Sequence, residues 1–393
     1  MRLAAIKPPQ LRTIHEEGER SATWLELFYD LVFVAAVAIL GVRLAKDSSF
    51  TGWLSYAAFF ALIWWLWASH TFYADRFDTD DLVYRLLAGV QMITIAMLAA
   101  SLSTDVSGST TVFAAAYALS RLVLIVMYVR VYRHVDEARH LVRGYLTGFS
   151  MAASLWIVSV VTPEPWRFVL WGIALAIDLA TPYVMRKAQA SVPLDVSHLP
   201  ERFGLFTILV LGETIVAVTV GLSHVSWQWT TTLVGAFGIM VATGLWWIHF
   251  DNLDGFVVRR RGAAKAWRPT AWIYTHLPLA IGLAMVGIGI EHAIIAADGD
   301  HVYHTDERLI FIFGVIMALG SMALIQFASV GQKAEHVKRR IVGNRVIGIA
   351  AVAVIGALAF LGPVATVSLV VVVIAVEVGV DILALSVPAD RAP

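Results

Sequence analysis

Six ionisable side chains lie within long apolar stretches of this chain, some of them near the middle and others about one helical turn from an end. They are Asp30, Arg121, Asp178, Glu213, Glu377 and Asp381. A charge at the centre of a membrane-spanning helix costs roughly 2.5–3.5 kcal/mol, so such a group needs a partner, a proton or water. Acids held in this way can take up and release protons or cations, which is the chemistry that a coupled transporter uses.

Four of these residues are expected at a similar depth. Counting about 1.5 Å per helical residue places Arg121, Asp178, Glu213 and Glu377 near the middle of the bilayer. One arginine cannot neutralise three carboxylates, so burial favours a proton on at least one acid. We predict a midplane site with Arg121 as the counter-ion. The alternative is that Arg121 and one acid form a structural ion pair between helices.

The first apolar segment begins with two carboxylates on one helical face. Glu26 and Asp30 are four residues apart. Thr23 stands three residues before Glu26, a capping-box pattern that explains Glu26 as a helix cap. Asp30 lies a turn deeper, and we predict that it lines a polar pocket facing the cytoplasm. Asp381 follows Glu377 by one turn, and we place it on the same cytoplasmic access route.

Two pairs of aspartates have the spacing of a magnesium–diphosphate site. Asp75 and Asp78 form one pair, and Asp251 and Asp254 form the other. Carboxylates in such pairs can hold Mg²⁺ against a diphosphate. An enzyme acting on a lipid-linked diphosphate is therefore one hypothesis. The alternative is that the acidic run from Asp78 to Asp81 caps the next helix.

The composition excludes several other classes of chemistry. The 393 residues are 59% hydrophobic and 15% charged, with a mean hydropathy of +0.74 and no long polar segment for a separate soluble domain. The chain has no cysteine, so disulfides and cysteine-based metal or redox sites are excluded. It also lacks P-loop, zinc-protease, serine-hydrolase and haem-attachment patterns, so we expect no cofactor. The polar N-terminus has no signal-peptide core, and the first apolar segment is expected to direct insertion.

Twelve apolar segments are long enough to cross a bilayer. Their approximate spans are 24–43, 53–73, 83–102, 110–130, 144–162, 166–185, 202–222, 229–250, 271–295, 309–330, 346–361 and 364–385. This pattern predicts an all-α polytopic membrane protein whose partner is the lipid bilayer.

The basic residues predict the orientation. If the N-terminus is cytoplasmic, 24 lysines and arginines fall on the inside and four on the outside, with Arg121 left within a helix. This positive-inside asymmetry places both termini in the cytoplasm. Basic runs such as Arg259–Arg261 and Lys338–Arg340 are explained by topology and anionic lipid, and they do not indicate a nucleic-acid partner. The oligomeric state does not follow from the sequence.

The chain shows signs of an internal repeat. Glu26-Leu-Phe28 opens the first apolar segment, and Glu201-Arg-Phe203 opens the seventh. We therefore predict two six-helix halves, 1–198 and 199–393. Because six is an even number, the two halves have the same orientation in the membrane, as in a parallel repeat.

Three motifs carry a resemblance over essentially the whole chain. They are Glu26-Leu-Phe-Tyr-Asp-Leu-Val-Phe-Val34, Arg76-Phe-Asp-Thr-Asp-Asp81 and Leu211-Gly-Glu-Thr214. Together they resemble the bacterial low temperature requirement protein A family. This resemblance implies a protein of the bacterial inner membrane that is linked to growth in the cold. It implies no particular reaction.

A second resemblance is to potassium channels of endosomes and lysosomes, which contain two six-helix repeats. Their first helices carry an arginine upstream of Phe-Ser-Asp, and here Arg20 precedes Phe28-Tyr-Asp30. The arginine spacing differs, and the second half has Phe203-Gly-Leu205 with no acid. The six-plus-six arrangement also resembles the major facilitator architecture, but an acidic run replaces the glycine- and arginine-rich motif after its second helix.

These observations favour a proton-coupled transporter of unidentified substrate. The reason is that several charges that are costly to bury are expected at one depth, in a chain that lacks known catalytic motifs. Three alternatives stay open: a magnesium-dependent enzyme on lipid-linked diphosphates, a cation channel, and a non-catalytic membrane component that supports growth in the cold. We regard an enzyme as the less favoured class.

Overall fold

The computed structural model describes residues 6–11, 21–78, 80–103, 109–192, 194–195, 198–251, 267–299, 302–329 and 335–386. Within these ranges, twelve helices are long and apolar enough to cross a membrane. The structure therefore confirms the all-α polytopic fold and the number of spans. The only sheet in the described ranges is a short antiparallel pair, in which Gln10 lies opposite Asp78 and Leu11 opposite Phe77.

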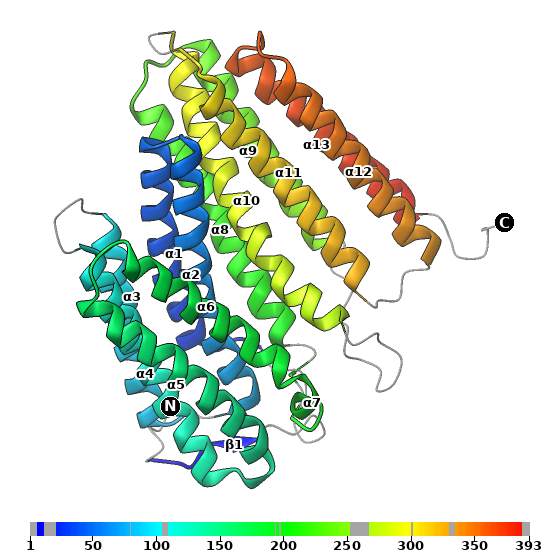
Figure 1. Ribbon diagram of the computed structural model, residues 1–393. Coiled ribbons are helices and arrows are strands. Elements are labelled where there is room, and N and C mark those ends of the chain that lie inside the picture. The colour runs from blue at the N-terminus through cyan, green and yellow to red at the C-terminus, as the bar shows by residue number, and fades with distance from the viewer. Residues whose placement is uncertain are drawn as a thin grey trace. The chain divides into compact units, whose positions relative to one another are not determined.

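The first part of the chain forms six long helices. Their bounds are α1 (Trp24–Lys46), α2 (Phe50–Arg76), α3 (Leu82–Leu102), α4 (Ser109–His134), α5 (Arg139–Val161) and α6 (Trp166–Val184); the short elements are β1 (Gln10–Leu11), β2 (Phe77–Asp78), a 3₁₀ turn (Asp136–Ala138) and α7 (Arg186–Gln189). Helices α3, α4, α5 and α6 pack in sequence order (Figure 1). An aromatic core joins α2 to α4 and α5, where the Tyr128 ring meets Tyr73 and Tyr145 edge-on.

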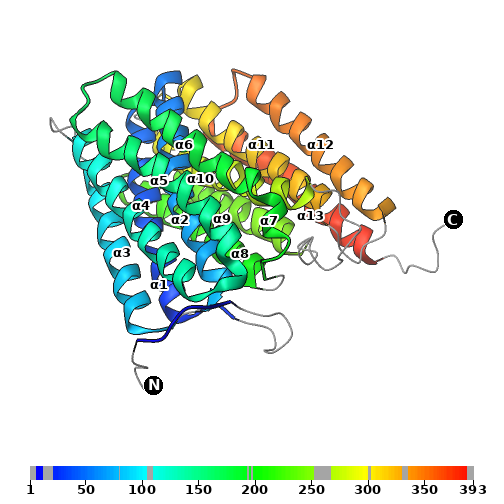
Figure 2. The same ribbon diagram turned by 60° about the horizontal axis from the view of Figure 1, so that its bottom comes forward.

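The second part also forms six long helices. They are α8 (His198–Ser223), α9 (Trp229–Phe250), α10 (Arg268–Ala297), α11 (Thr305–Ala328), α12 (Glu335–Ala357) and α13 (Pro363–Ser386). Helix α10 is apolar around most of its circumference, and it is accordingly the most buried of the spans. Helix α11 runs beside it, and α12 packs against both α11 and α13 (Figures 1 and 2).

The chain divides into two compact units. The first unit contains Met1–Leu40 and Ala58–Arg202, and the second contains Gly41–Ala57 and Phe203–Pro393. Helices α1, α2 and α8 each contribute residues to both units. The division into halves at residue 198, the parallel repeat and the cytoplasmic position of both termini stay predictions.

Local signals explain where several helices begin. Asp81 is the N-cap of α3, and its carboxylate accepts a hydrogen bond from the Tyr84 backbone N–H at 2.9 Å. This contact confirms the capping role expected for the acidic run, at Asp81. Arg130 holds the same carboxylate at 2.8 Å. Pro363 is the first residue of α13, a position where the missing N–H of proline costs no hydrogen bond.

One helix boundary expected from the sequence is wrong. The eleventh apolar segment was placed at 346–361, whereas α12 runs from Glu335 to Ala357. The hydropathy pattern started the helix too late because its first turns are rich in charge. Arg345, which lies just before the expected start of this segment, is a fully buried helical residue.

Helices α10 and α11 approach each other through glycine. A Cβ added at Gly314 would lie 2.9 Å from the Gly282 carbonyl oxygen and 2.8 Å from the Val286 backbone nitrogen. Gly314→Ala should therefore lower the free energy of unfolding by roughly 1–3 kcal/mol, as overpacking of a tight core does. Unfolding in a denaturing-detergent titration measures this change. Gly343 on α12 is the matched control, because its Cβ would meet open space; Gly343→Ala should be neutral or stabilising, and equal losses would contradict this account.

Candidate functional site

The two carboxylates at the start of α1 are both buried. Glu26 is 2% exposed and Asp30 is fully buried. The predicted capping box is confirmed: Glu26 Oε2 accepts from the Thr23 backbone N–H at 2.8 Å, and the Glu26 N–H donates to the Thr23 hydroxyl oxygen at 3.3 Å. Capping explains the contacts of Glu26 Oε2. It does not explain why Asp30 is buried.

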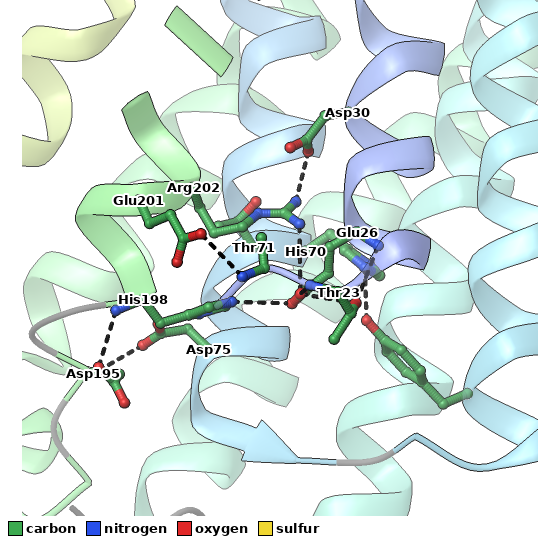
Figure 3. A network of polar contacts seen from close by, with 12 residues as sticks. Thr23, Glu26, Asp30, His70, Thr71, Asp75, Asp195, His198, Glu201 and Arg202 are labelled. Atoms are coloured by element: carbon green, nitrogen blue, oxygen red, sulfur yellow. Dashed lines mark hydrogen bonds and ion pairs between the residues drawn. The ribbon is translucent and has the colours of Figure 1, made fainter. Parts of the chain in front are cut away.

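Helix α8 supplies two basic side chains with the same spacing. His198 and Arg202 are also four residues apart, and both are fully buried. Arg202 Nη2 lies 2.6 Å from Asp30 Oδ1, and Nη1 lies 3.8 Å from Glu26 Oε2. His198 Nε2 lies 3.4 Å from Glu26 Oε1, which is ion-pair distance but long for a hydrogen bond. Figure 3 shows the two acids of α1 facing the two bases of α8.

Helix α2 closes the site from a third side. The Trp67 indole N–H donates to Asp30 Oδ1 at 2.7 Å. Two turns further along, Asp75 Oδ1 lies 2.9 Å from His198 Nδ1. Its second oxygen, Oδ2, accepts from the Asp195 backbone N–H at 2.8 Å (Figure 3). The starts of α1 and α8 and the end of α2 therefore meet at one place in the first unit.

The Asp195 side chain fixes the start of α8. Its Oδ1 accepts a hydrogen bond from the His198 backbone N–H at 3.0 Å, as a residue just before a helix does. The His198 ring lies between Glu26 and Asp75. We call Glu26, His198 and Asp75 the proton array, and Arg202 with Asp30 the arginine pair.

The proton array has a simple chemical consequence. A neutral imidazole carries one N–H, so it can donate to only one of the two carboxylates that it faces. One additional proton satisfies both contacts, either on the imidazole or on a carboxyl group. The array can therefore hold one extra proton between the imidazole and the two carboxylates.

The arginine pair is not fully satisfied. Among the described residues, Asp30 Oδ2 and Arg202 Nε have no hydrogen-bond partner, although both atoms are buried. Buried polar atoms without partners are costly, and in native proteins each one calls for an explanation.

Arg121 and Asp178 form a second buried centre, also in the first unit. Arg121 Nη2 lies 2.5 Å from Asp178 Oδ1, and neither side chain is exposed. The guanidinium also donates to the Ser69 hydroxyl at 2.9 Å and lies 4.5 Å from the Phe149 ring centroid. The contact joins α4 to α6, which is the geometry expected of an ion pair between helices. A role in transport for the pair stays a prediction.

Glu377 and Asp381 form a third centre, in the second unit. Both are buried on α13, and both pair with Arg345 of α12. Asn344 Nδ2 donates to Glu377 Oε2 at 3.0 Å. Gly348 leaves the space for the Glu377 carboxylate, because a Cβ there would lie 2.3 Å from its Oε1. The sequence pattern did not indicate Arg345 as the partner of these acids, because this residue lies just before the expected start of its apolar segment at residue 346.

The other predicted site residues do not form a buried ionic cluster of their own among the described residues. Glu213 is half-buried on α8 and has no hydrogen-bond or ion-pair partner among the described residues. Both oxygens of the metal candidate Asp75 already have protein partners, because Oδ2 accepts from the Asp195 backbone N–H and Oδ1 lies 2.9 Å from His198 Nδ1. Asp251 is exposed at the end of α9, while Asp254 and the side chain of Asp78 lie outside the described residues. Among the described residues no group of three His, Asp or Glu side chains could hold a metal ion.

The chain is similar to a known family of bacterial proteins. Residues 21–379 match the model of the bacterial low temperature requirement A protein family. An uncharacterized protein of Rhizobium meliloti (strain 1021) is 27% identical over 289 residues, which cover 70% of each of the two chains.

Proposed function

This chain belongs to the bacterial low temperature requirement A protein family, and we propose that it is a proton-coupled transporter with the proton array as its titrating element. It is a multi-pass membrane protein by fold. We place it in the bacterial inner membrane, in keeping with the family. The position of His198 between the carboxylates of Glu26 and Asp75 carries the proposal.

The energetic cost of these groups supports the proposal. Three carboxylates, one guanidinium and one imidazole are buried in the first unit, each 2.6–3.8 Å from at least one group of opposite kind. Ionisable groups in membrane segments are expensive to bury, and they typically mark proton relays or solute pathways. A purely structural tie between helices would need only one satisfied pair.

The array suggests how a proton could change the structure. With the extra proton bound, His198 ties α8 to α1 through Glu26 and to α2 through Asp75. Without it, the neutral ring can donate to only one of them, and the other contact becomes repulsive. Proton release would thus free one helix end, while the arginine pair keeps α1 and α8 together. This two-state tie is the element that a proton gradient could bias.

The remaining residues of the predicted pathway keep their proposed roles. Glu213 is the candidate for contact with a solute, because it is half-buried and has no partner among the described residues. Asp178 with Arg121, and Glu377 and Asp381 with Arg345, are proposed as paired groups on the route. Asp30 is buried in this conformation, so its access to the cytoplasm requires a second conformation.

Proton movement in vesicles tests the proposal. Purified protein is reconstituted with an entrapped pH indicator, and a membrane potential is imposed with sodium, potassium or an amino-acid mixture outside. We expect solute-dependent proton movement, which His198→Gln abolishes because it removes the imidazole that shares the extra proton with the two carboxylates. The thermal unfolding midpoint of each variant shows that it is folded.

His224→Gln is the matched control, since His224 is exposed and lies outside the array. It should leave proton movement unchanged. Equal movement in wild type and in folded His198→Gln would remove the array from the mechanism. Proton movement in none of the solutes would contradict a transporter of these substrate classes and favour the non-catalytic hypothesis.

A further inference from the structure

A groove of about 590 Å³ runs between α5 and α6 in the first unit. Met151, Ala180 and Val184 line it and are exposed on the outer surface of these helices. The helices touch at its floor, because a Cβ at Gly148 would lie 2.1 Å from the Thr181 hydroxyl oxygen. The groove is therefore long, shallow and bounded by small or apolar side chains.

The two hydroxyls in the groove are already engaged. Thr147 donates to the Arg143 carbonyl oxygen at 3.0 Å, and Thr181 donates to the Ile177 carbonyl oxygen at 2.7 Å. Each bond is internal to one helix, so the wall of the groove offers no free donor. Such a surface suits an acyl chain and would not hold a polar solute.

One end of the groove is cationic. Arg143 and His140 line this end and are exposed, and among the described residues their side chains have no hydrogen-bond or ion-pair partner. Helix α7 packs against both α5 and α6 there, and it presents the exposed side chains of Arg186 and Lys187. Positive charge thus gathers where the apolar groove ends.

The expected orientation matches a lipid. The positive-inside pattern places the start of α5 at the cytoplasmic surface, where lipid headgroups lie. Basic pockets between membrane helices on that side bind acidic headgroups. We propose that the groove binds one anionic glycerophospholipid, with an acyl chain between α5 and α6 and its phosphate at Arg143 and His140. The site is independent of the proton array.

Lipid-dependent stability tests this site. The full-length protein in neutral detergent is titrated with phosphatidylglycerol, with phosphatidylcholine or with inorganic phosphate, and the thermal unfolding midpoint is followed. We expect a saturable rise with phosphatidylglycerol alone. Arg143→Gln should raise the lipid concentration needed for half of the effect by about fivefold, because it removes the main cation facing the headgroup.

Two further variants make the result specific. Arg139→Gln is the matched control, since Arg139 lies one turn earlier on α5 and pairs with Asp136 at 2.8 Å; it should titrate like wild type. Ala180→Phe should fill the groove from its exposed side. A photoreactive acyl-chain phosphatidylglycerol should label α5 and α6 in wild type and lose that label in Ala180→Phe.

Several results would overturn the proposal. They are equal stabilisation by the two lipids, an effect of inorganic phosphate alone, an unchanged titration of Arg143→Gln, and labelling that avoids α5 and α6. The lipid titration does not depend on His198, and the proton-movement assay does not depend on the groove. A failure of the lipid proposal can therefore be told apart from a failure of the transporter proposal.

Discussion

Arg202→Met should lower the free energy of unfolding by about 3–5 kcal/mol, because it leaves buried carboxylates without their cation. Arg202 is fully buried, and it lies 2.6 Å from Asp30 and 3.8 Å from Glu26. Methionine has a similar length but no charge, so the effect reports the lost electrostatic contact more than lost packing. A denaturing-detergent titration of the protein in bicelles measures it.

An exposed ion pair provides the control for Arg202→Met. Arg85 and Asp80 are 2.7 Å apart, yet their side chains are 31% and 54% exposed. Arg85→Met should change stability very little, because water screens such a pair and its ordering costs entropy. Similar losses for the two variants would show that charge burial is not what stabilises the start of α1 against α8.

Arg121→Leu alone and Asp178→Leu alone should each destabilise the protein by about 3–5 kcal/mol, since each leaves one buried charge without its partner. The two side chains are 2.5 Å apart and fully buried between α4 and α6. Replacing both should recover most of the stability, because two leucines restore an apolar contact and leave no charge behind. Unfolding free energies of all four proteins complete the double-mutant cycle.

The same four proteins separate a structural ion pair from a pathway residue. If Arg121 and Asp178 only join helices, the doubly substituted protein should regain proton movement in vesicles together with its stability. If they carry protons or solute, stability should return and proton movement should not. A doubly substituted protein as unstable as either single variant would contradict the local account of this pair, since a third charge would then have to be involved.

The fold could be predicted well because lipid imposes a strong length requirement. Any backbone in a bilayer must satisfy its own hydrogen bonds, so each apolar segment of sufficient length becomes a helix. The predicted helix start was wrong where the helix itself contains charged residues, as near Arg345. Averaged hydropathy does not distinguish a buried cation from a loop residue. The capping roles of Glu26 and Asp81 were also predictable, because a cap depends on residues three positions apart.

The acidic residues of the candidate site could be predicted from the sequence, but their basic partners could not. The spacing of Glu26 and Asp30 identified two acids on one helical face, and the same spacing in His198 and Arg202 was a signal that could have been matched to it. No sequence rule says which helix lies opposite which, and the two pairs are more than 160 residues apart in the chain. Figure 3 shows them face to face.

The sequence by itself determined the class of the protein, its twelve spans and six of the charges that are costly to bury, because hydrophobic length and helical period are local properties. Only the tertiary structure decided the partners: Asp30 with Arg202, Asp178 with Arg121, and Glu377 and Asp381 with Arg345. Pairing depends on which helices pack together, and that is settled by side-chain shape and electrostatics over the whole unit, which no local pattern records.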